Sequence, residues 1–297
     1  IDISAYKFNG PGGEGAPDWV HVVPVADPYR GPFRQTEGDD TAKLGARYAG
    51  TVAEALARID TLGRKTAAFI CEAFPSVGGQ IVPPDGYLRE TYAHVRKAGA
   101  LCIADEVQTG LGRLGQYFWG FEQQDAQPDI VVLGKPLGNG FPLAAVVTTA
   151  EIAASFANGM EFFSTFGGST VACRVGREVL AIIEDERLVH NAETTGQYLL
   201  DGLRALSERH EIIGDVRGLG LFIGVDLVEC RQRRTPASEA AHYVVNRMRD
   251  RRILIGRDGP AANVLKIRPP MTFAQADADL LLRDLDEVLN EVFIRRD

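Results

Sequence analysis

The chain has 297 residues, of which 45% are hydrophobic and 24% are charged, and this is enough to bury the core of one large or two modest domains. Its net charge is -8 and no run of Lys and Arg is dense enough to neutralise a row of phosphates, so nucleic acid is not an expected partner. No apolar stretch approaches the ~20 residues of a membrane span and the first residues lack a signal-peptide layout, so we expect a cytoplasmic protein with no membrane partner.

The first half of the chain alternates predicted strands with predicted helices. Short apolar runs mark the strands, and apolar residues three and four apart mark the helices. This rhythm is typical of a largely parallel sheet covered by helices. The predicted elements are a strand at 20–25, a helix at 40–62, a strand at 67–71 that ends at Glu72, a helix through Leu88, Tyr92 and Val95 that stops at Gly99, and strands at 101–104, 130–133 and 144–149.

The pattern changes near Gly176, where long predicted helices are interrupted by a strand at 219–227 and a shorter one at 264–267. This mixed arrangement favours a second domain of the α+β class. We therefore expect a large domain over residues 1–175 and a small C-terminal domain over residues 176–297. The last predicted helix presents one apolar face, formed by Leu281, Leu285, Val288, Leu289 and Val292.

The four cysteines, Cys71, Cys102, Cys173 and Cys230, lie far apart and form no Cys-x-x-Cys pair. Two of them fall inside apolar strand-like runs, where buried free thiols usually occur. We expect neither a disulfide framework nor a metal site.

Two predicted strands end in side chains of opposite charge, Asp105 and Lys135. Ligands of open α/β sheets bind at the carboxyl ends of the strands, so both side chains are expected to face one crevice. Burial or a cationic neighbour lowers the pKa of a lysine in such a place and frees its amine to form a Schiff base. An aspartate there can pair with a pyridinium nitrogen and strengthen the ring as an electron sink.

Spacing alone leaves other interpretations of this pair open. Asp105 and Lys135 could be ordinary charges at the solvated rim of a sheet. Residues 101–106 also look like a Walker B strand, which holds Mg²⁺ in ATPases. That interpretation requires a phosphate loop, but Asp129 stands where the loop needs its first glycine and Pro136 where it needs Ser or Thr, so we exclude an ATPase.

The surrounding residues form several blocks, in order and with regular spacing. They are ADEVQTGLGR at 104–113, PDIVVLGK at 128–135, GNGFPLAA at 138–145, TFGG at 165–168, VRGLG at 216–220 and KIRPP at 266–270. Together they resemble the class III (ω-type) aminotransferase family over nearly the whole chain. The resemblance implies the fold-type-I architecture of PLP-dependent enzymes, an α/β fold with a mostly parallel large-domain sheet, helices on both faces, and a C-terminal α+β small domain.

The resemblance also implies roles for individual residues. Lys135 would form the Schiff base with pyridoxal 5'-phosphate (PLP) and shuttle protons, and Asp105 would pair with the pyridine nitrogen. Val107 would pack on a face of the ring, and Gln108 would bind its phenolic oxygen. Thr165 would reach the cofactor phosphate of a neighbouring subunit, which implies a homodimer with shared active sites.

Three residues are candidates for substrate binding. By resemblance, Glu72 corresponds to an acidic residue near the substrate. Family members that bind an α-carboxylate usually have arginine three residues before a Pro-Pro pair, and here that position is Lys266. Arg268 shares a strand face with Lys266, so two cations are expected on one side of the site. Lysine does not reproduce the two-point carboxylate clamp of arginine.

The sequence around Lys135 and Thr165 is similar to that of one branch of the family, which holds ethanolamine-phosphate phospho-lyases and alanine-glyoxylate-aminotransferase-like proteins. The resemblance implies an aminotransferase that moves an amino group from a primary amine or amino acid to a keto acid. One alternative is a phospho-lyase acting on a phosphorylated amine such as ethanolamine phosphate, and another is an inactive homologue that acts as a binding module. Retention of Lys135 and Thr165 together with Asp105 and Gln108 argues against the inactive homologue.

The chain resembles the C-terminal two thirds of a longer family member. It begins with Ile1, and the Gly/Ser-rich helix start that binds the cofactor phosphate in the family does not occur in it. Because a helix N-terminus is the usual phosphate site, we expect this chain alone to bind PLP poorly.

Overall fold

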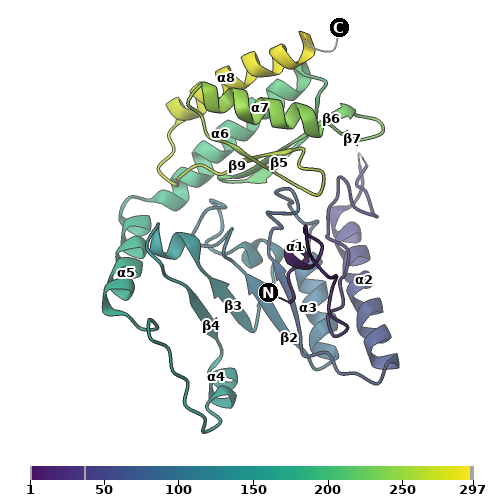
Figure 1. The fold of residues 1–297 in the computed structure, drawn as a ribbon, viewed down its shortest axis with the longest axis vertical. Helices are drawn as coiled ribbons and strands as arrows, with labels where there is room; N and C mark the ends of the chain where they lie inside the picture. The colour runs from purple at the N-terminus through teal and green to yellow at the C-terminus, as the bar shows by residue number, and fades with distance from the viewer. Residues whose placement is uncertain (1, 37, 295–297) are drawn as a thin grey trace.

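The computed structural model describes residues 2–36 and 38–294, and its strands form two main sheets (Figure 1). The first has the order β1-β2-β3-β4, in which β1, β2 and β3 are parallel and β4 is antiparallel to β3. The predicted parallel pairing is confirmed for the first three strands. β4 reverses because its connection from β3 contains only one short 3-10 helix, too little chain for a crossover. The bounds are β1 Ala68–Glu72, β2 Leu101–Asp105, β3 Ile130–Leu133 and β4 Ala145–Thr148.

Helices α2 (Thr41–Thr61) and α3 (Tyr87–Lys97) pack in one buried cluster with Cys102 of β2. Both confirm the helices predicted from apolar spacing. α2 starts after Asp40, whose carboxylate accepts hydrogen bonds from the N–H groups of the first turn. This cap satisfies donors that a helix start otherwise leaves unpaired.

The opposite face of the first sheet carries the candidate site. Because side chains alternate along a strand, Asp105 points away from the face that α2 and α3 cover. The register places Glu72 of β1 and Val132 of β3 beside it. Val146 of β4, the register partner of Val132, is 67% exposed, so this face is open at its β4 end in the described chain.

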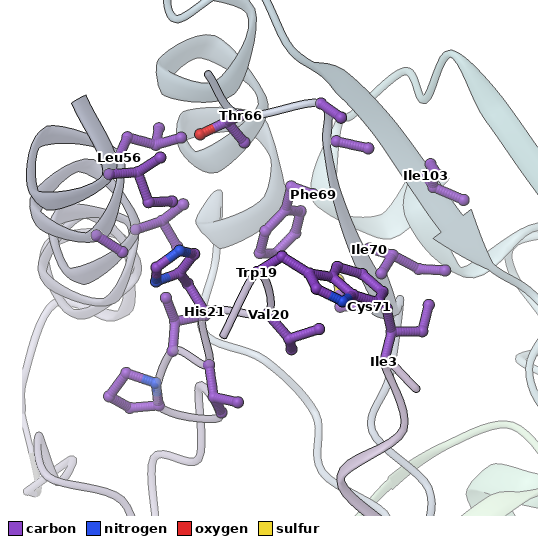
Figure 2. A pocket seen from close by; sticks show the side chains of 18 of the residues that line it. Ile3, Trp19, Val20, His21, Leu56, Thr66, Phe69, Ile70, Cys71 and Ile103 are labelled. Atoms are coloured by element: carbon purple, nitrogen blue, oxygen red, sulfur yellow. The ribbon is translucent and has the colours of Figure 1, made fainter. Parts of the chain in front are cut away.

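The predicted strand at 20–25 is wrong, because this segment pairs with no strand in the described parts of the chain. A groove of about 540 Å³ lies between the segment and β1 (Figure 2). Trp19 and His21 line the groove from the segment, and Phe69 and Ile70 line it from β1. Since the groove separates the two backbones, the apolar pattern of the segment forms no hydrogen-bonded ladder with β1.

The second sheet has the order β5-β6-β9-β8, with β7 paired to β6, and all these pairs are antiparallel. Where the sequence predicts one strand at 219–227, the structure has a hairpin of β5 and β6. Gly220 in its turn has a φ of +55°, a left-handed conformation that suits glycine and lets the chain reverse. The strand predicted at 264–267 is confirmed as β9. The bounds are β5 Ile213–Leu219, β6 Phe222–Cys230, β7 Thr235–Pro236, β8 Gly256–Asp258 and β9 Val264–Ile267.

Helices α6, α7 and α8 lie on one side of the second sheet (Figure 1). Leu265 and Ile267 of β9 belong to the core that these helices form. Val264 and Lys266 therefore point to the other side, toward the first sheet. The predicted domain boundary after residue 175 falls inside α5 and stays a proposal. The remaining bounds are α1 Ala5–Phe8, η1 Gly120–Gln124, η2 Lys135–Gly138, α4 Ala150–Phe156, α5 Thr170–Asp185, α6 Leu188–Arg209, α7 Ser238–Asp250 and α8 Gln275–Ile294.

A buried ion-pair network joins the two parts of the chain. The fully buried carboxylate of Asp226 accepts hydrogen bonds from Arg30 Nε at 2.9 Å and Nη2 at 2.5 Å. Arg217 Nη2 lies 3.3 Å from the same carboxylate. Arg217 also donates from Nε and Nη2 to the Gly79 carbonyl oxygen, at 3.0 and 2.7 Å. Because Gly79 belongs to the loop after Glu72, the network fixes the second sheet against a loop of the candidate site.

Candidate active site

The carboxyl ends of β1, β2 and β3 bring three predicted site residues together. Glu72 and Asp105 are register partners, and Lys135 follows the end of β3 by two residues. Burial raises the pKa of the Glu72 carboxyl, and the N–H of Ser76, at 3.0 Å, opposes that shift. The Asp105 carboxylate raises the pKa of Glu72 further, while Lys135 and Lys266 lower it. These groups therefore form one electrostatic cluster.

The Asp105 carboxylate is held by its own strand end. Its Oδ1 accepts a hydrogen bond of 2.9 Å from the N–H of Val107. A Cβ added at Gly134 would stand 3.5 Å from Cγ2 of Val107, so the backbone leading into Lys135 lies directly beside Val107. Asp105, Val107 and Lys135 thus lie close together in space, although they come from two separate sequence blocks.

Lys135 has an unusual backbone conformation. Its φ is +34°, on the positive side that residues other than glycine seldom adopt. It is the first residue of η2, and Pro136 is the second. Backbone strain of this kind concentrates at functional sites, which favours a chemical role for Lys135 over that of a rim charge.

Gln108 carries an unsatisfied polar atom. The residue is 9% exposed, and its Oε1 is buried without a hydrogen-bond partner in residues 2–36 and 38–294. Leaving such an acceptor unpaired costs about 1–3 kcal/mol. The atom is suited to accept a hydrogen bond from a ligand bound beside Asp105.

Glu106 has a structural role that the sequence did not reveal. Its side chain is 1% exposed and accepts hydrogen bonds from Thr109 Oγ1 at 2.8 Å and from the N–H groups of Gly120 and Phe121 at 2.9 Å. Burial raises the pKa of Glu106, and these three donors oppose the shift. The carboxylate thereby fixes the loop that carries Val107 and Gln108. An acidic residue directly before that loop was the only sequence signal.

The two predicted small-domain cations have different surroundings. Lys266 Nζ lies 2.6 Å from Oδ2 of Asp258, which also accepts a hydrogen bond from Gln80 Nε2 at 3.3 Å. Nε and Nη1 of Arg268 are buried and have no hydrogen-bond partner in the described chain. Burial lowers the pKa of Arg268, while Asp258 and Glu72 raise it. The charge of Lys266 is therefore paired with that of Asp258, whereas Arg268 has free hydrogen-bond donors near Glu72.

Arg113 supports the strand end that carries Arg268. Its Nη1 donates to the carbonyl oxygens of Pro269 at 2.8 Å and Leu221 at 3.2 Å. Burial, with the nearby charge of Arg268, lowers the pKa of Arg113 to about 10. The arginine thus ties the loop after β2 to the second sheet, a contact that the motif alone did not predict.

Thr165 is not brought into this cluster. It lies in the exposed segment between α4 and α5 and makes no hydrogen bond to Lys135, Asp105 or Gln108 within the described chain. In Figure 1 this segment extends away from the second sheet, at the lower left of the view. The contact of Thr165 with the cofactor phosphate of a neighbouring subunit, which the resemblance implies, stays a prediction.

Metal and membrane features are not found in the described part of the chain. Residues 2–36 and 38–294 hold no group of three or more His, Cys, Asp and Glu side chains that could bind a metal ion. Within the same ranges no helix has the length and apolar character needed to cross a membrane. Cys71, Cys102, Cys173 and Cys230 are free thiols.

Solved structures that share this arrangement of sheets and helices have the fold of PLP-dependent transaminases. A phospholyase from Arthrobacter in complex with phosphoethanolamine superposes with a TM-score of 0.84 at 35% identity, over 95% of this chain and 64% of that chain. A transaminase with L-alanine superposes with a TM-score of 0.82 at 29% identity, over 97% of this chain and 62% of that chain. The fold class expected from the sequence is confirmed.

The aminotransferase class-III family model matches residues 15–289, so the chain belongs to that family. An alanine-glyoxylate aminotransferase 2-like protein of Drosophila melanogaster is 48% identical over all of this chain and 60% of its own length. An ethanolamine-phosphate phospho-lyase homologue of Caenorhabditis elegans is 39% identical over 97% of this chain and 64% of its own length. The chain thus spans less than two thirds of the length of these relatives.

Proposed function

We propose that this chain contains the catalytic lysine of a PLP-dependent aminotransferase that acts on a primary amine or amino acid and a keto acid. The observation that carries the proposal is the placement of Asp105 and Lys135 at the ends of neighbouring strands, with an unpaired Oε1 on Gln108 three residues after Asp105. These residues fit PLP: Asp105 would pair with a protonated ring nitrogen, Val107 would pack on the ring, and Gln108 would form a hydrogen bond with its phenolic oxygen.

Lys135 has two tasks in this mechanism. Its amine would hold the cofactor through the aldehyde carbon and would be exchangeable with a substrate amine. When it is not bound to the cofactor, the same amine would accept the proton from the substrate carbon that bears nitrogen and carry it to the former aldehyde carbon of the cofactor, as transamination requires. When bound, PLP supplies an electron sink for the charge formed at that carbon. The fixed charge of Asp105 is oriented by the N–H of Val107 before reaction begins.

The substrate side of the site is formed by Glu72, Arg268 and Lys266. Free donors on Arg268 suit an anionic group of the substrate. Glu72, whose pKa is raised by burial, interacts electrostatically with Arg268 and with Lys135. A substrate that carries an amine at one end and an anionic group at the other fits this site, with its amine toward Lys135 and its anionic group toward Arg268.

A homodimer is part of the proposal. Thr165 lies in an exposed segment with Phe162, Phe163 and Phe166, the last of which is 85% exposed. Monomeric proteins seldom expose such clustered aromatic surface. A second copy that covers it would bring Thr165 to the cofactor phosphate of the partner subunit. The cytoplasmic location stays a prediction, and two relatives carry the word mitochondrial in their names.

A phospho-lyase is the second candidate. Lys266 in place of an arginine clamp is the sequence observation that favours it, and the Arthrobacter and C. elegans proteins, which resemble this chain, bear that description in their names. In that reaction water and phosphoethanolamine give acetaldehyde, ammonia and phosphate. The inactive homologue is disfavoured because the strained Lys135 and the unpaired Gln108 are both retained.

The test is to incubate the protein with a large excess of PLP, because the chain alone is expected to bind it poorly, and with two substrate sets. L-alanine with glyoxylate reports transamination as pyruvate and glycine, and phosphoethanolamine reports elimination as free phosphate. We expect pyruvate formation that Lys135→Ala abolishes and that Asp105→Asn slows about 10²-fold or more. Phosphate release without pyruvate would support the phospho-lyase. Turnover that survives Lys135→Ala would contradict both.

A further inference from the structure

Asp258 sets which cation of the second sheet is available. It stands at the end of β8, and Val264, Leu265 and Lys266 of β9 run alongside that strand. Its Oδ2 is 2.6 Å from Lys266 Nζ, and the two side chains are 20% and 23% exposed. A partly buried pair at this distance holds its lysine far more firmly than an exposed pair does.

A second contact fixes the carboxylate in place. Gln80 Nε2 donates to the same Oδ2 of Asp258 at 3.3 Å and to Ser76 Oγ at 2.8 Å. Gln80 is fully buried. Its loop is also held to the second sheet by Arg217. Asp258 is therefore held by the first part of the chain as well as by Lys266.

Arg268 has no comparable partner. It lies two residues beyond Lys266, on the same face, and its buried Nε and Nη1 are unpaired in the described residues. Asp258 and Glu72 act on its charge from a distance, but neither makes a hydrogen bond to it within that part of the chain. Of these two neighbouring cations, Arg268 thus has free donors, whereas the charge of Lys266 is paired with Asp258.

We propose that Asp258 is a specificity-determining residue that withholds Lys266 from the substrate, so that Arg268 alone binds its anionic group. This rests on the proposed function of the site. One unpaired guanidinium matches a group of single negative charge, such as a carboxylate or sulfonate. A phosphate of nearly two negative charges lacks a second partner while Asp258 holds Lys266. Asp258 thereby favours singly charged substrates over phosphorylated ones.

The test compares three small amines that differ in their anionic end. β-Alanine carries a carboxylate, taurine a sulfonate of one charge, and phosphoethanolamine a phosphate of nearly two charges. Taurine and phosphoethanolamine both end in a tetrahedral anionic group and differ in its charge and by one ester oxygen, so the readout is the change of their affinity ratio between variants. Dissociation constants are measured by calorimetry on the purified chain, and binding at the site is followed through the NMR signal of Arg268 Nε–H.

We expect Asp258→Asn to tighten phosphoethanolamine binding about tenfold and taurine binding about threefold or less. Asn keeps an oxygen for Gln80, so the loop contact is retained. Asp250→Asn is the matched control, because it removes one negative charge from an exposed pair with Arg247 on α7 and should change none of the three constants. In a Lys266→Met background, the preference gained through Asp258→Asn should vanish.

The outcomes distinguish a failure of the role of Asp258 from a failure of the proposed substrate site. An unchanged ratio of phosphoethanolamine to taurine affinity in Asp258→Asn would overturn the role of Asp258, and so would a gain that persists in full without Lys266. Arg268→Gln should weaken all three amines. If it weakens none, or if no amine binds the unaltered chain, the proposed substrate site itself is wrong.

Discussion

Asp226→Asn should destabilise the chain severely. The Asp226 carboxylate is fully buried and is the shared partner of Arg30 and Arg217. Removing one member of a buried ion pair costs about 3–5 kcal/mol, because it leaves the other charge uncompensated. Arg217 keeps Asp215 at 2.6 Å and Arg30 is 20% exposed. We therefore expect the free energy of unfolding to fall by an amount near the lower end of that range, about 3 kcal/mol.

The assay is equilibrium urea unfolding followed by circular dichroism, with the free energy of unfolding extrapolated to water. Asp250→Asn removes the same charge from an exposed pair and should cost less than about 1 kcal/mol. Arg30→Gln combined with Asp226→Asn should cost less than the sum of the two single changes. A loss below about 1 kcal/mol for Asp226→Asn, or strict additivity with Arg30→Gln, would refute the reasoning.

Two further substitutions test the site through stability. Burial raises the pKa of Glu72, so the folded chain keeps this proton to higher pH than the unfolded chain and loses stability as pH rises above about 4.3. The Tm of Glu72→Gln relative to the natural chain should therefore increase between about pH 4 and pH 7, and an equal difference at both values would contradict the shift. Glu106→Gln places an amide against N–H donors and should cost about 1–3 kcal/mol in urea unfolding; an unchanged midpoint would show that Glu106 does not hold the loop.

Local sequence patterns predicted the elements that position Asp105 and Lys135. β1, β2 and β3 are short apolar runs whose ends carry Glu72 and Asp105 and lead to Lys135, and parallel strands place such ends at one edge. Motif resemblance then assigned roles to Val107 and Gln108. These features were accessible because each depends on residues close together in the chain.

Long-range partners were not accessible in this way. The pairing of Lys266 with Asp258 depends on the β8 and β9 register, and their contact with Gln80 joins residues far apart in sequence. The apolar run at 20–25 has strand character, but a strand also needs a neighbour within hydrogen-bonding distance, and a groove lies there instead. The sequence alone therefore could not show which of Lys266 and Arg268 has free hydrogen-bond donors, because this depends on the fold.

The central claim is that Lys135 is the lysine that binds PLP. The most direct measurement is borohydride reduction of the chain after incubation with excess PLP, followed by proteolysis and mass spectrometry of the lysine-containing peptides. We expect the phosphopyridoxyl group mainly on the peptide with Lys135, and a sharp decrease of that label in Asp105→Asn. Label spread evenly over the other lysines, or concentrated on one of them while Lys135 stays unmodified, would contradict the account.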